Sequence, residues 1–258
     1  MSNKTRNFLY NAISLFFSLN KFFKNKKNQN KLIILMYHSV IKSNKFLIDN
    51  NFIISENNFI DHINLIHKNN FYKFVKINND SKNYKGINLA LTFDDGFKNN
   101  LEFVAEFLNQ YQIPIHIYVC TKFLKNNYTN YLNLNELKKL SNFQNVTIGS
   151  HSLSHPFLSK LSNKEIQFEL SESKKIIEDI ISCEVNQISY PNGSYSNVVV
   201  KIAEQLGYLI GLTSIFNSNN NLSDNMKLAR YNIEGLDNKF KLNNKIKGYH
   251  DWYSMLQK

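Results

Sequence analysis

The sequence predicts an α/β protein built on a parallel β-sheet. Short apolar runs alternate along the chain with longer amphipathic segments, a pattern typical of strands joined by crossover helices. The length of 258 residues suits one barrel-sized domain with a buried core. A hydrophobic content of 43% and an aromatic content of 14% exclude a disordered chain. The apolar runs are too short for a transmembrane helix.

Strands are expected where short apolar runs end in polar residues, as in buried parallel sheets. These runs cover residues 32–37, 87–93, 113–119, 146–149, 187–190 and 208–213. Helical spacing of apolar residues predicts helices over residues 56–68, 99–109, 134–140, 163–181 and 197–206.

Several of the predicted helices carry signals at their ends. Asn133 is a predicted N-cap, and Ser162 with Glu165 forms a capping-box pattern. Gly207 is placed to end the helix before it. We expect one folded domain over residues 31–258.

The first 30 residues form a separate segment, with six basic side chains and no acidic one. Over residues 7–24 the apolar side chains recur at helical spacing, which fits an amphipathic helix in a membrane interface. Packing against the domain's own core explains the pattern equally well, and a frayed tail is a third reading. Asn11 interrupts the apolar run and no A-x-A site follows, which disfavours a signal peptide. We therefore expect a cytoplasmic protein, or one on the cytoplasmic membrane face, rather than a secreted or periplasmic one.

The net charge of +11 comes from 29 Lys and only two Arg, Arg6 and Arg230. Together with 42 Asn, this composition fits an AT-rich genome as well as a binding surface. Because Arg is rare and no nucleic-acid motif is present, no nucleic-acid partner is expected. Cys120 and Cys183 exclude a disulfide scaffold and a CxxC site, and two free buried thiols are favoured over one disulfide.

Polar residues follow three of the predicted strands: His38, the pair Asp94 and Asp95, and the pair His151 and His155. The carboxyl ends of parallel strands meet at one edge, where ligands bind. Taken separately, a D-D-G sequence is a common surface turn and the two histidines are ordinary loop residues, so neither alone indicates a metal site. Together they supply two imidazoles and a carboxylate, which suits a catalytic zinc or similar ion. On one helical turn, the four-residue spacing would place both imidazoles on one face.

Three motifs in this order, TFDDG at Thr92–Gly96, HSLSHP at His151–Pro156 and SYPNG at Ser189–Gly193, resemble the polysaccharide deacetylases with a NodB homology domain, carbohydrate esterase family four. MYHSV at Met36–Val40 is similar to the poly-N-acetylglucosamine deacetylase-like subgroup. The resemblance implies a distorted (β/α)7 barrel, with the NodB homology core over about residues 87–258. It also implies a hydrolase that removes acetyl groups from N-acetylated sugars of a polysaccharide or of a lipid-linked or surface glycan.

The resemblance further assigns roles. Asp94 matches the catalytic base, while Asp95, His151 and His155 match the ligands of one divalent metal. Zn²⁺ is the favoured ion, with Fe, Co, Ni and Mn left open. The metal would polarise the acetamide carbonyl and acidify a water that Asp94 deprotonates. The backbone N–H of the residue after Pro191, here Asn192, would stabilise the oxyanion.

The sequence departs from the family pattern in the partner of the base. The Arg of the third motif would fall at Ser189, which cannot orient a carboxylate in the same way. Arg230 is the only Arg in the body of the chain, and we expect it to pair with Asp94 or with an anionic substrate. A structural or surface Arg is an equal alternative.

Two further departures concern the substrate and the general acid. The aromatic residue usual after the proline is Asn192, and no late Leu-x-His motif supplies a general acid. His38 is the candidate to protonate the leaving amine or to contact substrate, with a loop-holding role as the alternative. His250 lies too far down the tail to be assigned.

These departures keep open a second function, a catalytically weak or inactive carbohydrate-binding protein on the same fold. Exposed aromatics such as Tyr190, Tyr195 and Trp252 would then stack on sugar rings. The remaining histidines are expected to be structural or surface residues, namely His62, His67 and His116.

Overall fold

The computed structural model of the chain describes residues 30–42, 52–79, 85–125, 128–220 and 223–256. The helix predicted over residues 7–24 and the boundary at residue 30 lie at or beyond the edge of these ranges, so both stay predictions. Within the ranges, no helix combines the length and the apolar character needed to span a bilayer.

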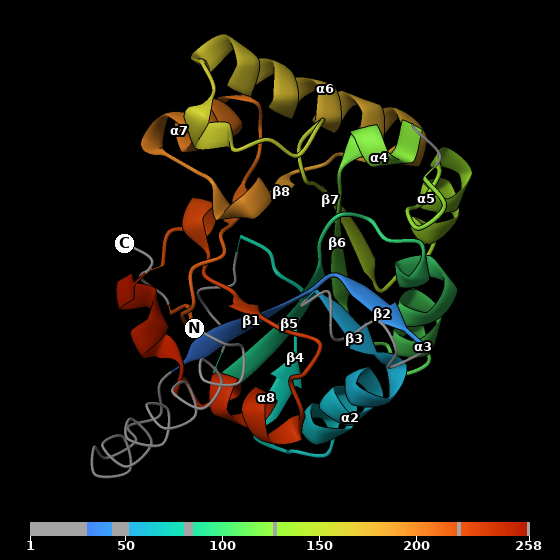
Figure 1. Ribbon diagram of the computed structural model, residues 1–258, viewed down its shortest axis with the longest axis vertical. Helices are drawn as coiled ribbons and strands as arrows, with labels where there is room; N and C mark the ends of the chain where they lie inside the picture. Colours follow the sequence, from blue (N-terminus) through green and yellow to red (C-terminus); the bar gives the residue numbers. More distant parts are fainter. Residues whose placement is uncertain (1–29, 43–51, 80–84, 126–127, 221–222, 257–258) are drawn as a thin grey trace.

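The described residues form an eight-stranded, wholly parallel sheet that curls into a distorted (β/α) half-barrel, as predicted (Figure 1). Its path runs β10-β1-β5-β6-β7-β8-β9, and β4 pairs with the beginning of β5. A separate parallel pair, β2 and β3, lies beside it. The strands are β1 Lys31–Tyr37, β2 Ser39–Ile41, β3 Ile53–Ser55, β4 Tyr72–Phe74, β5 Ile87–Phe93, β6 Ile115–Val119, β7 Val146–Ser150, β8 Gln187–Ser189, β9 Ile210–Leu212 and β10 Tyr231–Asn232.

Helices surround the curled sheet, with α6 and α7 on one side of Figure 1 and α2 and α8 on the opposite side. The α-helices are α2 Glu56–His67, α3 Glu106–Asn109, α4 Thr121–Lys125, α5 Leu134–Leu140, α6 Asn163–Ile181, α7 Asn197–Gln205 and α8 Lys239–Ile246. A π-helical stretch, Asn100–Ala105, leads into α3. Short 3₁₀ turns are Leu158–Lys160, Pro191–Gly193, Asn225–Lys227 and Asp251–Leu256.

The observed starts of α5 and α6 match the capping residues predicted from the sequence. Asn133 and Ser162 each accept a hydrogen bond from the backbone three residues on, and both helices have the full reciprocal capping box. Each box satisfies two N–H groups that the first helical turn leaves without partners. The starts of α5 and α6 are thereby fixed by local sequence, and α6 is the helix that packs over the second motif.

The strand register aligns the loops that carry the motifs. Met36 of β1 pairs with Thr92 of β5 on one side and with Asn232 of β10 on the other. The backbone N–H of Asp94 then donates to the Tyr37 carbonyl (3.0 Å), and that of His151 donates to the Val119 carbonyl (2.9 Å). The first, second and third motifs therefore leave the sheet at one edge, together with the end of β10.

The cysteine expectation needs a correction. Both thiols are free, as expected, and Cys120 is buried, but Cys183 is exposed. Cys183 follows the left-handed C-cap residue of α6, Ser182, and so lies just beyond the end of the helix and its buried face.

Candidate active site

Asp95, His151 and His155 converge at the carboxyl edge of the sheet. The Nε2 atoms of His151 and His155 lie 3.4 Å and 3.5 Å from the same oxygen, Oδ1 of Asp95. One ligand atom from each residue lies within 4.8 Å of the other two. His151 is buried, and the other two side chains are partly exposed. The geometry therefore presents one carboxylate and two imidazoles to a common point.

These three residues fit a metal ion. Zinc ligands lie about 2.0–2.1 Å from the ion, so two corners of a tetrahedral site are about 3.3 Å apart, close to the separations found here. Nδ1 of His151 donates to the Ser189 carbonyl (2.8 Å), which leaves the Nε2 lone pair directed at the site. Burial lowers the pKa of both imidazoles, which favours their neutral, ligating form.

The two histidines converge through a loop rather than through the helical turn expected from their spacing. Residues 151–157 are neither helix nor strand, and Ser152 and His155 have φ angles of 62° and 64°. The Ser152 hydroxyl accepts from the His155 N–H (3.1 Å), which closes a tight turn. The left-handed backbone at His155 rotates its ring back toward His151, with ring centroids 4.8 Å apart.

Helix α6 holds this loop in place through Glu169, a residue that the sequence reasoning missed. Its carboxylate accepts from the Ser154 N–H (2.9 Å) and hydroxyl (2.5 Å), and its carbonyl accepts from the Leu153 N–H (3.2 Å). A signal was present: Glu169 lies on the apolar face of α6 between Ile166 and Leu170, where a carboxylate needs a specific partner.

Asp94 lies beside the triad and is bound on its other side by Arg230. Nη1 and Nη2 of Arg230 each donate to a different Asp94 oxygen at 2.8 Å, a bidentate pair. The remaining guanidinium N–H groups donate to the Thr213 carbonyl (2.9 Å), the Thr92 hydroxyl (3.3 Å) and the Ser189 hydroxyl (2.8 Å). All five donors of this fully buried guanidinium are therefore used.

Of the two partners expected for Arg230, the structure shows Asp94; its part in catalysis stays a prediction. Ser189, in the place of the usual Arg, donates its hydroxyl to Asp94 Oδ2 (3.0 Å) while it accepts from Arg230. Burial acts to raise the pKa of Asp94, but the charges of Arg230 and His151 and the hydrogen bonds from Arg230 outweigh it and hold that pKa well below its usual range.

Asp95 has the opposite electrostatic environment. Burial, followed by the charge of the neighbouring Asp94, raises its pKa to about 6, and the charges of His151 and Arg230 offset this only in part. A carboxylate that is buried and lacks a cation is a site that a metal ion would stabilise. Arg230 thus balances the charge of Asp94, whereas the charge of Asp95 has no such partner and would be balanced by a cation bound at the triad.

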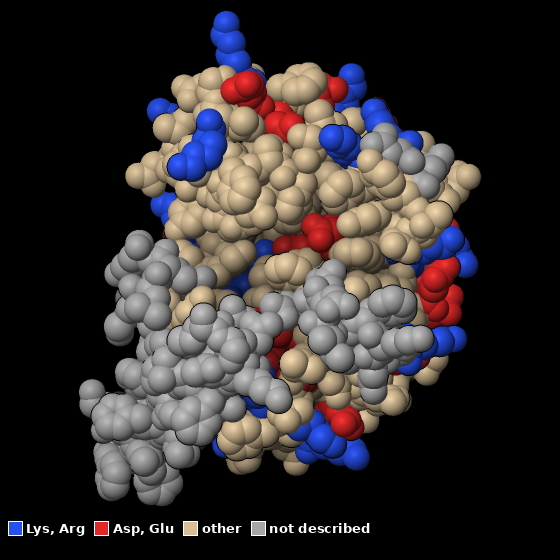
Figure 2. Space-filling model, in the orientation of Figure 1, with Lys and Arg blue, Asp and Glu red and all other residues tan. Residues whose placement is uncertain are grey.

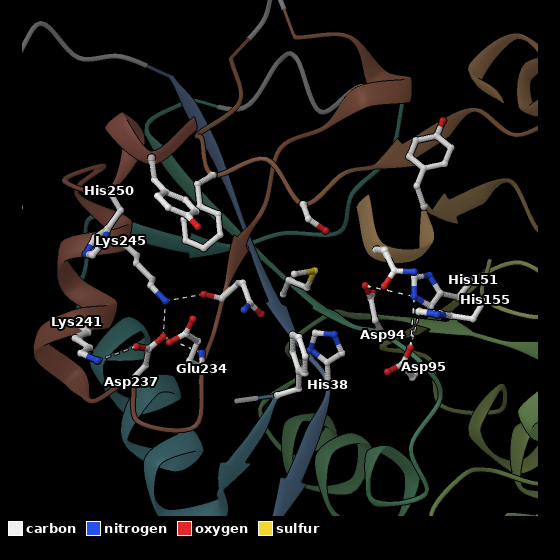
Figure 3. Close-up of a pocket in the computed structure, with 18 residues that line it drawn as sticks. His38, Asp94, Asp95, His151, His155, Glu234, Asp237, Lys241, Lys245 and His250 are labelled. Carbon is white, nitrogen blue, oxygen red and sulfur yellow. Dashed lines mark hydrogen bonds and ion pairs between the residues drawn. The ribbon is translucent and has the colours of Figure 1, made fainter. Parts of the chain in front are cut away.

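A cavity of about 430 Å³ opens beside these residues. Figure 2 shows a recess in this face of the molecule, with acidic and basic atoms visible inside it. His38, Tyr190 and Asn192 line it together with the triad and Asp94. Figure 3 places His38 between the triad and a second group of charged side chains, which consists of Glu234, Asp237, Lys241 and Lys245.

His38 lines the cavity. It follows β1, is 9% exposed and packs against Phe52 with ring centroids 4.6 Å apart. Its Nδ1 atom is buried and has no hydrogen-bond partner among the described residues. Burial lowers the pKa of His38 to about 4, so the imidazole is neutral near pH 7. Because His38 lines the cavity, it is the candidate for contact with a bound substrate.

The structure also places the remaining expected site residues, Pro191 and Asn192, and His250 of the tail. Pro191 begins the turn after β8, and the Asn192 side chain lines the cavity, where its backbone has a left-handed φ of 56°. Whether the Asn192 N–H stabilises an oxyanion stays a prediction. His250, set aside for its position in the tail, lines the same cavity.

The aromatic residues expected to be exposed need a correction. Tyr190 is fully buried and donates its hydroxyl to the Met226 carbonyl (3.0 Å), so it is not a surface platform. Tyr195 is half-buried and stacks on Tyr190 with centroids 5.7 Å apart. The side chain of Trp252 lies outside the part of the chain that the structure describes.

The other histidines lie away from the triad. His62 is buried between the Tyr37 hydroxyl (3.2 Å) and the Asp237 carbonyl (2.8 Å). His116 is buried between the Ile77 N–H (2.9 Å) and the Gln187 side chain (2.9 Å). His67 is exposed on α2 and contacts Tyr111. Their surroundings are those of structural and surface residues.

Comparisons with known proteins agree with this fold. The Bacillus subtilis protein YxkH, provisionally named a polysaccharide deacetylase, is 27% identical over 190 residues. That match covers 71% of this chain but only 64% of YxkH, less than two thirds of its length.

Solved structures superpose on most of the chain. The Streptococcus pyogenes deacetylase PplD, determined in complex with acetate, has a TM-score of 0.75 at 22% identity, covering 84% of this chain and 98% of PplD. A de-N-acetylase from Aggregatibacter actinomycetemcomitans has a TM-score of 0.73 at 17% identity, covering 84% of this chain and 100% of that one. At these identities the likeness establishes a shared fold.

The decisive comparison is with protein families. The model of the family described as polysaccharide deacetylase matches residues 81–211, just over half of the chain. The matched region contains the two aspartates, the two histidines of the triad and the Pro191 turn. The chain that carries this site is therefore a member of the polysaccharide deacetylase family.

Proposed function

We propose that this protein is a metal-dependent N-deacetylase that removes acetyl groups from N-acetylated sugars of a polysaccharide or of a lipid-linked or surface glycan. One observation carries the proposal: a metal-ligating triad with 3.4 Å and 3.5 Å contacts adjoins a carboxylate held by a buried Arg, in one cavity. This arrangement pairs a site for a cation with a base that the cation does not occupy.

When bound by Asp95, His151 and His155, a divalent ion such as Zn²⁺ would polarise the acetamide carbonyl and acidify water. Fe, Co, Ni and Mn suit the same ligand set. Asp94 is the base. Its oxygens accept three hydrogen bonds, two from Arg230 and one from Ser189, out of the roughly four that a carboxylate accepts. One acceptor position on Oδ1 is left to take a proton from the attacking water.

Arg230 fixes which position that is. Its bidentate contact holds the carboxylate plane, and its other donors are tied to Thr92, Thr213 and Ser189. The residual lone pair of Asp94 therefore has a defined direction before substrate arrives, which lowers the reorganisation needed in the reaction.

His38 is assigned to the leaving nitrogen. As a neutral imidazole it can present one N–H and one lone pair to the cavity. Negative charge that develops on the substrate oxygen raises the proton affinity of a nearby imidazole, so His38 would take up a proton from solvent and pass it to the nitrogen as the C–N bond breaks. The Asn192 backbone N–H is assigned to the oxyanion as a second donor.

The first test is metal content by elemental analysis of the purified protein, paired with acetate release from chito-oligosaccharides. About one bound metal per chain with acetate release supports the proposal. Metal without acetate supports the site and directs the search to another N-acetylated glycan. No metal after incubation with zinc or cobalt would remove the basis of the proposal.

The alternative, a carbohydrate-binding protein without activity, rested on the missing Arg of the third motif and on the missing late Leu-x-His motif. The contact between Arg230 and Asp94 supplies an Arg to the base from another part of the chain. This weakens the reason for the alternative, and acetate release by the purified protein would exclude it.

We also propose that the substrate is a glycan near the cytoplasmic face of a membrane, because of the basic amphipathic pattern over residues 7–24. The full chain should co-sediment with vesicles containing anionic lipid, and a chain lacking residues 1–30 should not. Equal sedimentation of the two, or recovery of a cleaved protein outside the cell, would contradict this. Membership of the poly-N-acetylglucosamine subgroup and the absence of a nucleic-acid partner also stay expectations.

A further inference from the structure

Two of the three candidate metal ligands lack the support that fixes the third. His151 is buried, and its Nδ1 donates to the Ser189 carbonyl (2.8 Å). Asp95 and His155 are partly exposed, and among the described residues neither side chain has a hydrogen bond or ion pair with a residue outside the triad. Both also have left-handed backbones, with φ angles of 72° and 64°. Such conformations persist only where surrounding contacts impose them, so other contacts hold these two ligands.

On the side of His155 the contact is a ring. The His155 imidazole packs nearly parallel to Phe123 of α4, at an interplanar angle of 28° with centroids 6.3 Å apart. The same imidazole lies edge to face with His151, at a centroid distance of 4.8 Å. Phe123 is itself packed against Tyr131, with centroids 4.5 Å apart. The His155 ring therefore has an aromatic neighbour besides His151, and that neighbour limits the orientations open to it.

On the side of Asp95 the contact is a backbone bridge. Phe97, two residues after Asp95, pairs with Tyr131 in an antiparallel bridge. Two backbone hydrogen bonds of 2.9 Å flank the bridge, one from Lys98 to Asn130 and one from residue 132 to residue 96. The Phe97 and Tyr131 rings stack at an angle of 23° with centroids 4.7 Å apart. The bridge thus closes the turn that carries the Asp95 carboxylate.

Phe97, Phe123 and Tyr131 form one aromatic cluster that contacts both partly exposed ligands. All three side chains are half-buried. Among the described residues, the partly buried aromatics that pack on the main core do not include them. They are also absent from the lining of the 430 Å³ cavity. Neither core packing nor the cavity wall therefore accounts for the cluster, whereas its contacts with the ligand-bearing segments do.

We propose that this aromatic cluster positions Asp95 and His155 for metal binding, and that Phe123 is the positioning residue for the His155 ring. The inference rests on the proposed function for the presence of a metal. It gives the two partly exposed ligands a support made of stacked rings and a backbone bridge, where His151 has a hydrogen bond. Metal affinity then depends on α4 and on the segment before α5, neither of which supplies a ligand.

The test measures zinc affinity of the full chain by titration against a competing chelator. Phe123→Ala should weaken zinc binding by about tenfold, the lower end of the usual effect of losing a group that orients a metal ligand. Phe123→Tyr keeps the ring at a half-buried position and should bind zinc as the unmodified chain does. The matched control is Phe107→Ala, which removes a half-buried Phe that contacts Phe103 (5.6 Å) and Tyr111 (5.5 Å) and no metal ligand.

A second readout separates positioning from general stability. The visible absorption bands of the cobalt-loaded chain depend on the geometry of the ligands around the ion. These bands should change in Phe123→Ala and stay unchanged in Phe123→Tyr and Phe107→Ala. Urea unfolding of the metal-free proteins reports the packing cost of each substitution, so a purely structural role would lower stability in both alanine variants and leave zinc affinity and the cobalt bands alone.

Unchanged zinc affinity and cobalt bands in folded Phe123→Ala would overturn the inference, and so would an equal loss of affinity in Phe107→Ala. If Phe123→Ala does not fold, Phe123→Leu takes its place, because it keeps an apolar side chain without the flat ring. Its affinity should fall between those of the alanine variant and the unmodified chain, and an affinity equal to that of the unmodified chain would contradict the role of the ring. An unmodified chain that binds neither metal would end the proposed function and this inference together. Zinc binding that is insensitive to Phe123 would end the inference alone.

Discussion

Asp94 and Asp95 are neighbours in sequence, yet their surroundings drive their pKa values in opposite directions. Arg230 and His151 hold the pKa of Asp94 well below its usual range against the effect of burial, and burial raises the pKa of Asp95 to about 6. Asp94 therefore stays ionised without a metal, whereas Asp95 gains from one. The proposed roles, Asp94 as base and Asp95 as metal ligand, follow from which of the two carboxylates the Arg230 guanidinium contacts.

Asp94→Asn should lower acetate release by about 10²–10⁴-fold, the usual contribution of a general base, because the amide cannot take a proton. Metal content should be unchanged, since Asp94 is not one of the three residues that converge on the site. Turnover and elemental analysis on the same preparation check both parts. His151→Ala is the contrasting variant and should lose the metal as well. Normal turnover in Asp94→Asn would show that the base is another residue.

Arg230→Met should destabilise the fold by about 3–5 kcal/mol, because it leaves the Asp94 charge buried without its partner. In the Asp94→Asn background the same change should cost much less, since no charge remains to be stranded. Urea unfolding of the two single variants and the double variant measures the coupling as a double-mutant cycle. If the losses in free energy of unfolding of the two single variants add up to the loss of the double variant, Arg230 and Asp94 have no net interaction.

At the scale of elements, helix α6 holds the loop between β7 and α6 in its observed conformation, although no residue of α6 belongs to the triad. Glu169 of α6 anchors Ser154 by two hydrogen bonds, and this sets the relative position of the two histidines. The sequence motifs predict the three candidate ligands, but their spacing does not predict the contact between Glu169 and Ser154.

Glu169→Ala should weaken zinc affinity by about 10–100-fold, the usual effect of losing a group that orients metal ligands. The matched control is Glu172→Ala on the same helix, which should bind zinc as the unmodified chain does. Zinc titration against a competing chelator gives both constants. Far-ultraviolet circular dichroism reports whether α6 remains folded, and unchanged affinity in folded Glu169→Ala would remove Glu169 from the positioning role.

The sequence predicted those elements whose signals are local. Apolar runs such as residues 87–93 and capping boxes at Asn133 and Ser162 depend on neighbours in the chain, so their strands and helices were found close to their observed bounds. Strands of two or three residues, such as β4 and β10, are too short to show a period, and they form because the adjacent strand offers a ladder.

The candidate site was predictable to the same degree. The ligand and base positions follow strand ends, and Arg230 stood out because the chain has so few Arg. The helical turn expected at His151 and His155 was wrong because left-handed φ angles at Ser152 and His155 depend on contacts with Glu169 and with the loop itself. Asn232 reaches the cavity through the pairing of β10 with β1, and His250 follows α8, which packs against α2. No local pattern encodes either contact.

At the scale of the whole molecule, the site joins distant parts of the chain. Strand β1 lies between β5 and β10, so His38 and Arg230 are brought to the motifs of the region over residues 81–211 although both lie outside it. The candidate site thus depends on the complete sheet rather than on the matched region alone. Global unfolding should therefore remove the site as a unit.

That global stability should depend on pH through the buried histidines. Burial lowers the pKa of His62 and His116 to about 4, below the unfolded value of about 6.5. Between these values the unfolded chain binds more protons, so the free energy of unfolding is largest above pH 6.5 and falls as pH drops toward 4. Each group contributes on the order of 3 kcal/mol to the full change.

His116 isolates one such contribution. Its Nε2 accepts from the Ile77 N–H and its Nδ1 donates to Gln187, so a proton on Nε2 would remove the acceptor on which Ile77 depends. His116→Gln cannot titrate, and its free energy of unfolding should fall less steeply between pH 7 and pH 5 than that of the unmodified chain. Urea unfolding of both proteins at several pH values measures the difference, and groups common to both cancel. Parallel curves would mean that His116 is protonated to the same extent in the folded and unfolded states, which contradicts a neutral, buried imidazole joining Ile77 to Gln187.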